Sequence, residues 1–164
     1  MSEDTPDAIV KTLLLKAEPA RVWQAVADSG QFGAWFGMAL DGPFVAGQEI
    51  TGVIVPTAVN AEVAAMQEPH RGTPVRLAIA DIVPPHRFSF RWHPFAIEKD
   101  RDYSAEPMTL ITFELTPAAG GTQLTITESG FHQIPLERRA QAFAADDGGW
   151  TWQCKLIEAY LARG

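Results

Sequence analysis

Residues 146–162 read DDGGWTWQCKLIEAYLA, and this stretch decides the fold. One face of a 3.6-residue helix carries an apolar side chain at each turn, namely Trp150, Cys154, Ile157 and Leu161. Asp147 precedes two glycines and is expected to be the N-cap of a helix from Gly148 to Ala162. Trp152 and Leu156 widen the apolar arc beyond what a helix on a flat surface needs. We therefore predict that a sheet curls around this helix.

The preceding sequence supplies strands for that sheet. Alternation of apolar and polar residues, or β-branched content, predicts strands within 8–17, 38–41, 47–55, 75–83, 88–92, 111–116 and 124–127. Val75, Leu77, Ile79 and Val83 are expected to share one face of their strand. Short helices are expected after Pro19 and over 136–145, and Phe32, Trp35 and Phe36 are expected to form an aromatic turn that closes one end of the core. The order of elements predicts an α+β fold with an antiparallel sheet.

The length of 164 residues predicts one domain that spans 1–164. Residues 1–7 are expected to form a disordered tail. Two segments rich in proline and charged residues, 56–73 and 94–107, are expected to be long loops. Loops of this length are often functional or mobile.

Charge and composition exclude several classes of protein. The 13 basic and 20 acidic side chains give a net charge of −7, which disfavours binding to nucleic acid. No run approaches the roughly 20 apolar residues of a membrane span. The acidic N-terminus lacks the features of a signal peptide, so we expect a cytoplasmic protein.

Metal and cofactor signatures are missing from the sequence. The single cysteine, Cys154, allows no internal disulfide and no thiolate zinc cluster. The four histidines show no metal-ligand spacing, and the chain has no Walker loop, no dinucleotide fingerprint and no Gly-x-Ser-x-Gly motif. We expect neither a metal nor a cofactor.

One polar residue continues an apolar strand face. Strict alternation places Glu128 on the same face as Leu124 and Ile126, near the end of the strand. A buried carboxylate needs hydrogen-bond donors or a raised pKa. Either Glu128 reaches water or an arginine at the strand end, or it is the polar anchor of a ligand pocket.

The aromatic side chains form the largest candidate set. Five tryptophans and nine phenylalanines can fill the core or line a concave apolar cavity, and both alternatives remain open. The residues expected to line such a cavity are Trp35, Phe36, Phe88, Phe90, Trp92, Phe113, Glu128, Trp150 and Cys154.

Several motifs in order carry a family resemblance. They are AEPARVWQAV (17–26), FGAWF (32–36), FSFRWHP (88–94), GTQLTITESGF (121–131) and the Gly149-Trp150 pair. Between about Ile9 and Leu161 the chain resembles the START-like (SRPBCC) superfamily, and within it the family of the C-terminal domain of the activator of heat-shock protein 90 ATPase. The resemblance implies a helix-grip fold, in which a curved antiparallel sheet wraps a long C-terminal helix around a cavity.

The leading expectation is a binding protein, with an apolar small molecule or lipid held between sheet and helix. One alternative is a co-chaperone-like interaction that stimulates a heat-shock ATPase. Another is a cofactor-free enzyme of the cyclase or dehydratase kind, for which Glu128 and His93 are the candidate acid/base groups.

Overall fold

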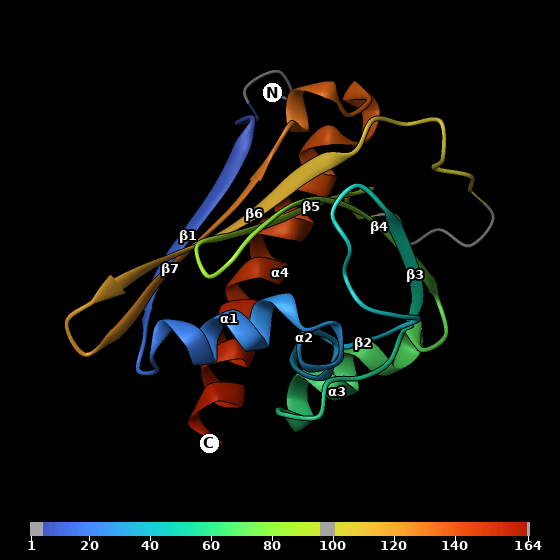
Figure 1. The fold of residues 1–164 in the computed structure, drawn as a ribbon. Coiled ribbons are helices and arrows are strands. Elements are labelled where there is room, and N and C mark those ends of the chain that lie inside the picture. Colours follow the sequence, from blue (N-terminus) through green and yellow to red (C-terminus); the bar gives the residue numbers. More distant parts are fainter. Residues whose placement is uncertain (1–4, 96–100, 164) are drawn as a thin grey trace.

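A curved sheet and one long helix dominate the computed structural model, which describes residues 5–95 and 101–163 (Figure 1). The strands are β1 (Ala8–Leu15), β2 (Met38–Leu40), β3 (Glu49–Ile54), β4 (Pro74–Val83), β5 (Arg87–Trp92), β6 (Thr109–Ala118) and β7 (Gly121–Ser129). They form one seven-stranded sheet in the order β1-β7-β6-β5-β4-β3-β2, and all neighbouring pairs are antiparallel. The sheet is unclosed, with β1 and β2 at its edges, and the predicted α+β helix-grip fold is confirmed.

Four helices accompany the sheet within the described residues. They are α1 (Pro19–Ala27), α2 (Ser29–Phe36), α3 (Ala61–Gln67) and α4 (Leu136–Ala162), with single 3₁₀ turns η2 (Glu68–His70) and η3 (Phe131–Gln133). Helices α1 and α2 lie beside the C-terminal half of α4 (Figure 1). Tyr160 of α4 contacts both helices. Its hydroxyl donates to Gln31 Oε1 of α2 at 3.2 Å, and its ring centroid lies 5.2 Å from the guanidinium carbon of Arg21 in α1.

Helix α4 is continuous over 27 residues, so the predicted start at Gly148 and the predicted N-cap at Asp147 are wrong. Asp147 instead accepts a 2.8 Å hydrogen bond from Lys11 Nζ on β1. A helical glycine costs about 1 kcal/mol relative to alanine, which lowers the propensity without ending a helix that tertiary packing supports. The apolar stripe supplies this packing, since Trp150, Leu156 and Ile157 are buried.

Replacing Gly148 or Gly149 by alanine is expected to raise the free energy of unfolding by about 0.5–1 kcal/mol each. Both glycines are exposed, and a Cβ at either position would meet no heavy atom within 4 Å. Urea unfolding of the single variants measures the effect. Gly33→Ala in α2 is the control, and it is expected to lower the free energy of unfolding because its Cβ would collide with the carbonyl oxygen of Met38. A loss of stability in both α4 variants would contradict the expectation.

The predicted aromatic turn is helix α2. Asp28 caps this helix by accepting a 2.9 Å hydrogen bond from the Gln31 amide. Glycines at 30 and 33 lower helix propensity and hid the helix in the sequence. Phe32, Trp35 and Phe36 are nevertheless buried together, and Trp35 Nε1 donates to the Ala25 carbonyl at 2.8 Å.

The segment expected to be a long loop, 56–73, contains α3 and η2 between two irregular stretches. Asn60 caps α3 by accepting from the Val63 amide at 2.9 Å. The other expected loop, 94–107, falls partly outside the described residues, and its described part forms no helix or strand.

Part of the expected disordered tail is held in place. Within 1–7, residues 1–4 lie outside the described residues, whereas Thr5 and Asp7 contact η3. The Asp7 carboxylate accepts from the His132 amide at 2.9 Å, and the Thr5 carbonyl lies 2.7 Å from His132 Nε2. These bonds explain why the chain is ordered before β1 begins.

A register shift changes the face assigned to Val83. The pairing of β4 with β5 shifts between Ile79 and Ile82, so that Ile82 pairs with Phe88. Ile82 takes the position on the buried face, and Val83 is 39% exposed. Ser89 accommodates the irregularity, since its hydroxyl accepts from the Asp81 amide at 3.1 Å.

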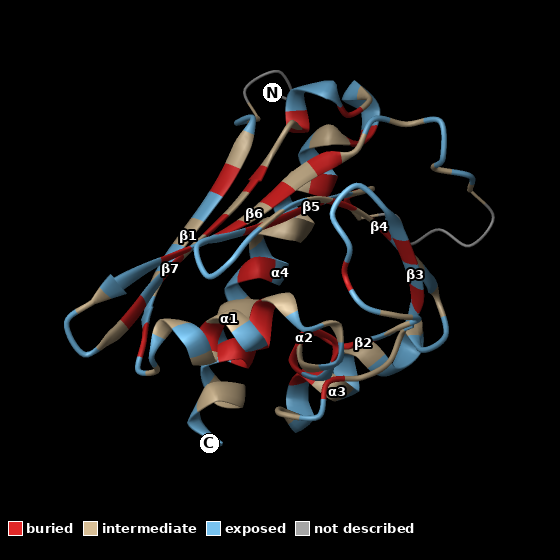
Figure 2. Ribbon diagram, in the orientation of Figure 1, coloured by how far each residue is buried: buried red, intermediate tan, exposed pale blue. Residues whose placement is uncertain are grey.

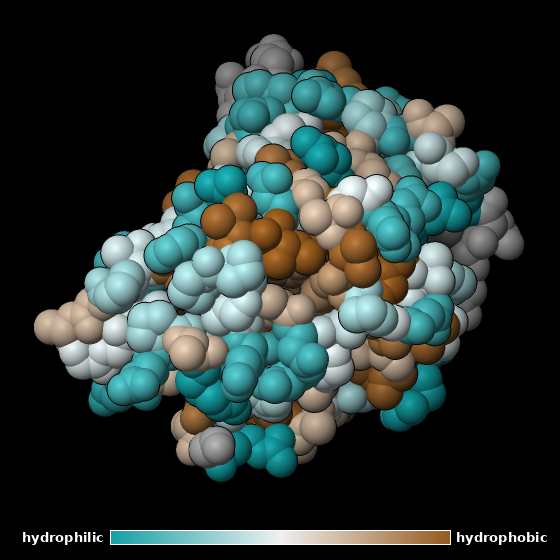
Figure 3. Space-filling view, viewed as in Figure 1, coloured by the Kyte–Doolittle hydropathy of each residue, from teal (hydrophilic) through white to brown (hydrophobic). Residues whose placement is uncertain are grey.

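The core lies between the sheet and the helices. Figure 2 shows buried residues recurring along β1, β6 and β7 and gathering in α1 and α2. On the face shown in Figure 3, hydrophobic side chains gather near the middle and hydrophilic ones surround them. Within the described part of the chain, no helix combines the length and apolar character needed to cross a bilayer.

Candidate functional site

Glu128 is fully buried at the end of the apolar face of β7. Its Oε2 accepts hydrogen bonds from Thr109 Oγ1 at 2.6 Å and Trp92 Nε1 at 2.9 Å. Its Oε1 accepts from Trp150 Nε1 at 2.8 Å. The alternation therefore assigned the correct face, but the expected water or arginine partner is replaced by three neutral donors. Short hydrogen bonds to a carboxylate offset the cost of burying it.

A second carboxyl group lies beside Glu128. Asp146 precedes Trp150 by four residues on α4, so both side chains project from one helical face toward β7. Asp146 Oδ2 is buried, and no described group donates a hydrogen bond to it. A capping role was predicted for the neighbouring Asp147, but both aspartates lie inside α4 and neither caps it.

Burial raises the pKa of the Asp146 carboxyl well above its ordinary value. The charge of Glu128 and a hydrogen bond to it act in the same direction, while the charge of Arg138 opposes them. Protonated Asp146 can donate to the Glu128 carboxylate, and the two groups then share one proton. We refer to Glu128 and Asp146 as the acid pair.

A groove with a volume of about 780 Å³ opens beside the acid pair. It forms where β4 and β5 separate, because their pairing ends at Ala78 and Arg91 while β4 begins at Pro74. Trp92, the last residue of β5, and Asp146 both border the groove. The sheet thus leaves space next to Asp146, whose buried Oδ2 accepts no hydrogen bond from a described group.

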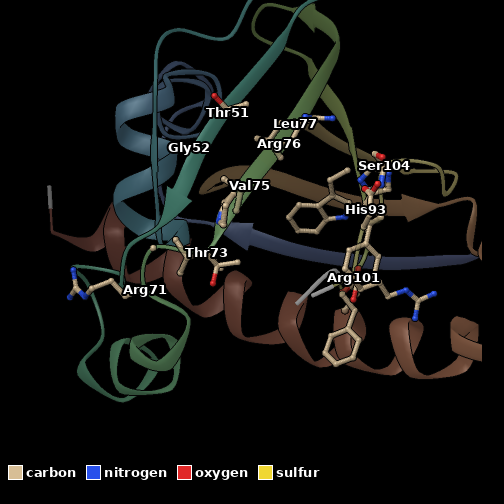
Figure 4. Close-up of a pocket in the computed structure, with 18 residues that line it drawn as sticks. Thr51, Gly52, Arg71, Thr73, Val75, Arg76, Leu77, His93, Arg101 and Ser104 are labelled. Carbon is tan, nitrogen blue, oxygen red and sulfur yellow. The ribbon is translucent and has the colours of Figure 1, made fainter. Parts of the chain in front are cut away.

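The two walls of the groove differ in origin (Figure 4). One wall comes from β3 and β4 and includes Ile54, Val75 and Leu77. The other comes from residues on either side of the undescribed stretch 96–100 and includes His93, Phe95, Tyr103 and Ser104. In Figure 4, α4 passes along the bottom of the view beneath both walls. The lining is therefore mixed, because apolar and aromatic side chains lie beside polar and charged ones such as Thr73, Arg76 and Asp102.

Arg138 of α4 fixes the second wall. Its side chain is only 7% exposed and donates to Glu106 Oε1 at 2.8 Å and to the Pro94 carbonyl at 2.9 Å. The guanidinium also packs 4.9 Å from the Tyr103 ring centroid. Burial alone would raise the pKa of Glu106, but hydrogen bonds and charge from Arg138 and Arg101 lower it. The resulting ion pair connects the wall to the helix.

The arginines at the rim have carboxylate partners. Arg71 Nε lies 2.6 Å from Glu68 Oε2, and Arg101 Nη2 lies 2.8 Å from Glu106 Oε2. These contacts reduce the positive potential that the rim would otherwise present. Among the described residues, no group of three or more histidine, cysteine or acidic side chains could hold a metal ion.

The structure places the predicted site residues in several locations. Glu128 belongs to the acid pair. Trp92 borders the groove and also packs against Phe36, Phe90 and Trp150, with ring centroids 5.6–5.9 Å apart. The rings of Trp35, Phe36, Phe88, Phe90, Phe113 and Trp150 pack against one another and against Phe32 and Phe44, with centroids 4.8–6.4 Å apart. Cys154 is half-buried on α4, and burial raises the pKa of its thiol. A ligand-binding role for residues outside the groove stays a prediction.

Sequence reasoning missed Asp146 and the apolar wall of β3 and β4. The available signal for Asp146 was its i, i+4 relation to Trp150, which places an acidic residue on the apolar face of the helix. The groove itself had no local signal, because it depends on where two strands stop pairing.

Solved structures similar to this chain share its fold. Protein MLL2253 from Mesorhizobium loti has 22% identity and a TM-score of 0.69, with 95% of this chain and 97% of that chain covered. Protein Ms6760 from Mycobacterium smegmatis has 19% identity and a TM-score of 0.69, with coverages of 96% and 92%. A protein from Arthrobacter aurescens has 18% identity and a TM-score of 0.71, with coverages of 96% and 87%. At these identities the likeness shows the fold alone.

A family profile matches nearly the whole folded chain. No match was found among curated proteins. The profile described as "Activator of Hsp90 ATPase homolog 1-like protein" matches residues 16–162, which begin directly after β1 and end with α4. This range includes the acid pair and all residues of the groove. The chain therefore belongs to the family of activator of Hsp90 ATPase homolog 1-like proteins.

Proposed function

We propose that the protein binds a small apolar or aromatic molecule in the groove beside Trp92. The observation that carries the proposal is a groove in which aliphatic and aromatic side chains lie among polar ones, next to Asp146, a carboxyl group whose buried oxygen has no described donor. Ligand sites are mostly apolar, contain a few placed polar groups and have volumes of about 300–1,000 Å³. The groove, at about 780 Å³, lies within this range.

The groove replaces the sheet–helix interior as the proposed position of the ligand. Phe88, Phe90 and Phe113 are fully buried and contact one another, so a ligand between them would have to displace packed rings. Trp92 instead borders open space while its indole nitrogen donates to Glu128. Its orientation is thus fixed before a ligand arrives, which lowers the entropy lost on binding.

The binding free energy would come mainly from apolar burial. Each Å² of apolar surface removed from water contributes roughly 25 cal/mol before the costs of association are subtracted. The wall formed by Ile54, Val75 and Leu77 offers aliphatic surface, and Phe95 and Tyr103 offer aromatic surface opposite.

A blocking substitution tests the location. Wild-type protein is expected to bind the neutral fluorescent probe N-phenyl-1-naphthylamine, with enhanced probe emission and a one-to-one complex in native mass spectrometry. Val75→Trp fills the groove from β4 and is expected to weaken binding at least about tenfold. Val83→Trp places the same side chain at the exposed, distant end of β4 and should leave binding unchanged. Equal binding by all three proteins would contradict the proposal.

The acid pair favours a second candidate, a cofactor-free enzyme of the cyclase or dehydratase kind. Such an enzyme needs a proton donor or acceptor at its binding site, and a carboxyl with a raised pKa can act as a general acid. Asp146→Asn would then abolish turnover while substrate still binds. Equal turnover by the variant and the wild type would exclude Asp146 as the acid.

The family match favours the alternative of an interaction with a chaperone ATPase. The description of the matched profile names an activator of the Hsp90 ATPase. Co-purification with such a chaperone, together with faster ATP hydrolysis on addition of this protein, would support the alternative. Val75→Trp separates the two roles, since a blocked groove should leave a surface-mediated ATPase effect intact.

A further inference from the structure

Glu128 has no capacity left to bind a ligand directly. A carboxylate offers about four lone-pair positions. Three of them accept from Trp92, Thr109 and Trp150, and the fourth can accept the shared proton of Asp146. The side chain is also 0% exposed, so a ligand in the groove cannot reach it.

Asp146 has the opposite properties. It borders the groove and is only half-buried, whereas its Oδ2 is buried and has no described donor. A carboxylic acid that donates its proton to a neighbour still has a lone pair available on its carbonyl oxygen. Asp146 can therefore donate inward from its buried Oδ2 to Glu128 and accept outward at Oδ1 from a molecule in the groove.

We propose that Asp146, held by Glu128, accepts a hydrogen bond from a hydroxyl group of the ligand, so that the groove selects apolar or aromatic alcohols and phenols. This inference rests on the proposed binding function and names the polar group that the ligand carries. Glu128 is a positioning residue, because it fixes the orientation of Asp146 without touching the ligand. A site built to pair with a hydroxyl discriminates against analogues that lack the hydroxyl.

Charge favours a neutral ligand. The acid pair carries one negative charge when it holds one proton, and Arg138, whose charge acts on Asp146, is already bound to Glu106 and the Pro94 carbonyl. An anionic head group beside Asp146 would face the buried charge of Glu128, and the described arginines that line the groove, Arg71, Arg76 and Arg101, each already have a carboxylate partner. A hydroxyl donor makes the needed contact without adding charge.

Two probes of similar shape test the inference. At pH 7 we expect wild-type protein to bind 2-naphthol about fivefold more tightly than 2-methoxynaphthalene, the ratio that one net hydrogen bond supplies. Isothermal titration calorimetry measures both affinities. Asp146→Asn should keep the preference, because its amide can donate to Glu128 and leave its carbonyl oxygen for the ligand. Asp146→Leu should reduce the ratio to about one.

Asp147→Asn is the matched control, since this neighbour pairs with Lys11 on β1 and does not border the groove. Its affinity ratio should equal that of the wild type. Equal affinities of the two probes for the wild type would overturn the inference and leave the proposed binding function standing. Failure of both probes to bind, or binding that Val75→Trp does not weaken, would overturn both. If Asp146→Leu does not fold, the ratio of the two probe affinities measured for the wild type still tests the inference.

Discussion

Glu128→Ala is expected to lower the free energy of unfolding by about 3–5 kcal/mol. The substitution removes the acceptor of three hydrogen bonds, from Trp92, Thr109 and Trp150, and leaves these donors unpaired. Each buried unsatisfied polar group costs about 1–3 kcal/mol, and water that enters the new space recovers part of the loss. Urea unfolding followed by circular dichroism measures the change.

Two comparisons separate this effect from the general loss of a carboxylate. Glu114 lies exposed on β6, and Glu114→Ala should change stability by no more than about 0.5 kcal/mol. Glu128→Gln should fall between the two alanine variants, because its amide nitrogen would face at least one of the donors that now point at carboxylate oxygens. Similar stabilities of Glu128→Ala and Glu114→Ala would show that the buried hydrogen bonds do not support the fold.

The fold was predictable because its elements have strong local patterns. Alternation along β6 and β7 identified which residues face the helix, and the same rule placed Glu128 inside. The helical stripe from Trp150 to Leu161 identified the element that the sheet surrounds. Both patterns arise from the side-chain period of a single segment, so no tertiary information was needed.

The errors occurred where local propensity and tertiary packing disagree. Gly148 and Gly149 predicted an interruption, but the buried side chains on either side hold α4 together. In α2, two glycines masked a helix that the Asp28 cap and aromatic burial stabilise. Propensity is a weak guide when burial contributes several kcal/mol to the same segment.

The candidate site was less predictable because it depends on non-local geometry. The acid pair joins β7 to α4, and the groove exists because β4 and β5 stop pairing at Ala78 and Arg91. No periodicity within one segment reports either arrangement. The sequence did identify Glu128 and Trp92 as candidates, and the structure shows that they contact each other.

The aromatic cluster behind the groove has its own expected effect. Phe32 is fully buried, and its ring centroid lies within 6.4 Å of six others, those of Trp35, Phe36, Phe44, Phe88, Phe90 and Phe113. No other ring in the described core has so many neighbours among these pairs. The side chain therefore connects α2 to the central strands, although the sequence assigned it only to a turn.

Phe32→Ala is expected to lower the free energy of unfolding by about 3–5 kcal/mol, because the surrounding rings can close only part of the space that it leaves. Urea unfolding provides the measurement, and Phe143→Ala is the matched control. Phe143 is half-buried on α4 and its ring packs against Phe131, so its removal should cost about half as much. Equal losses at the two positions would mean that the cluster is deformable. A deformable cluster could open to admit a ligand, and the sheet–helix interior would then again become a candidate binding site.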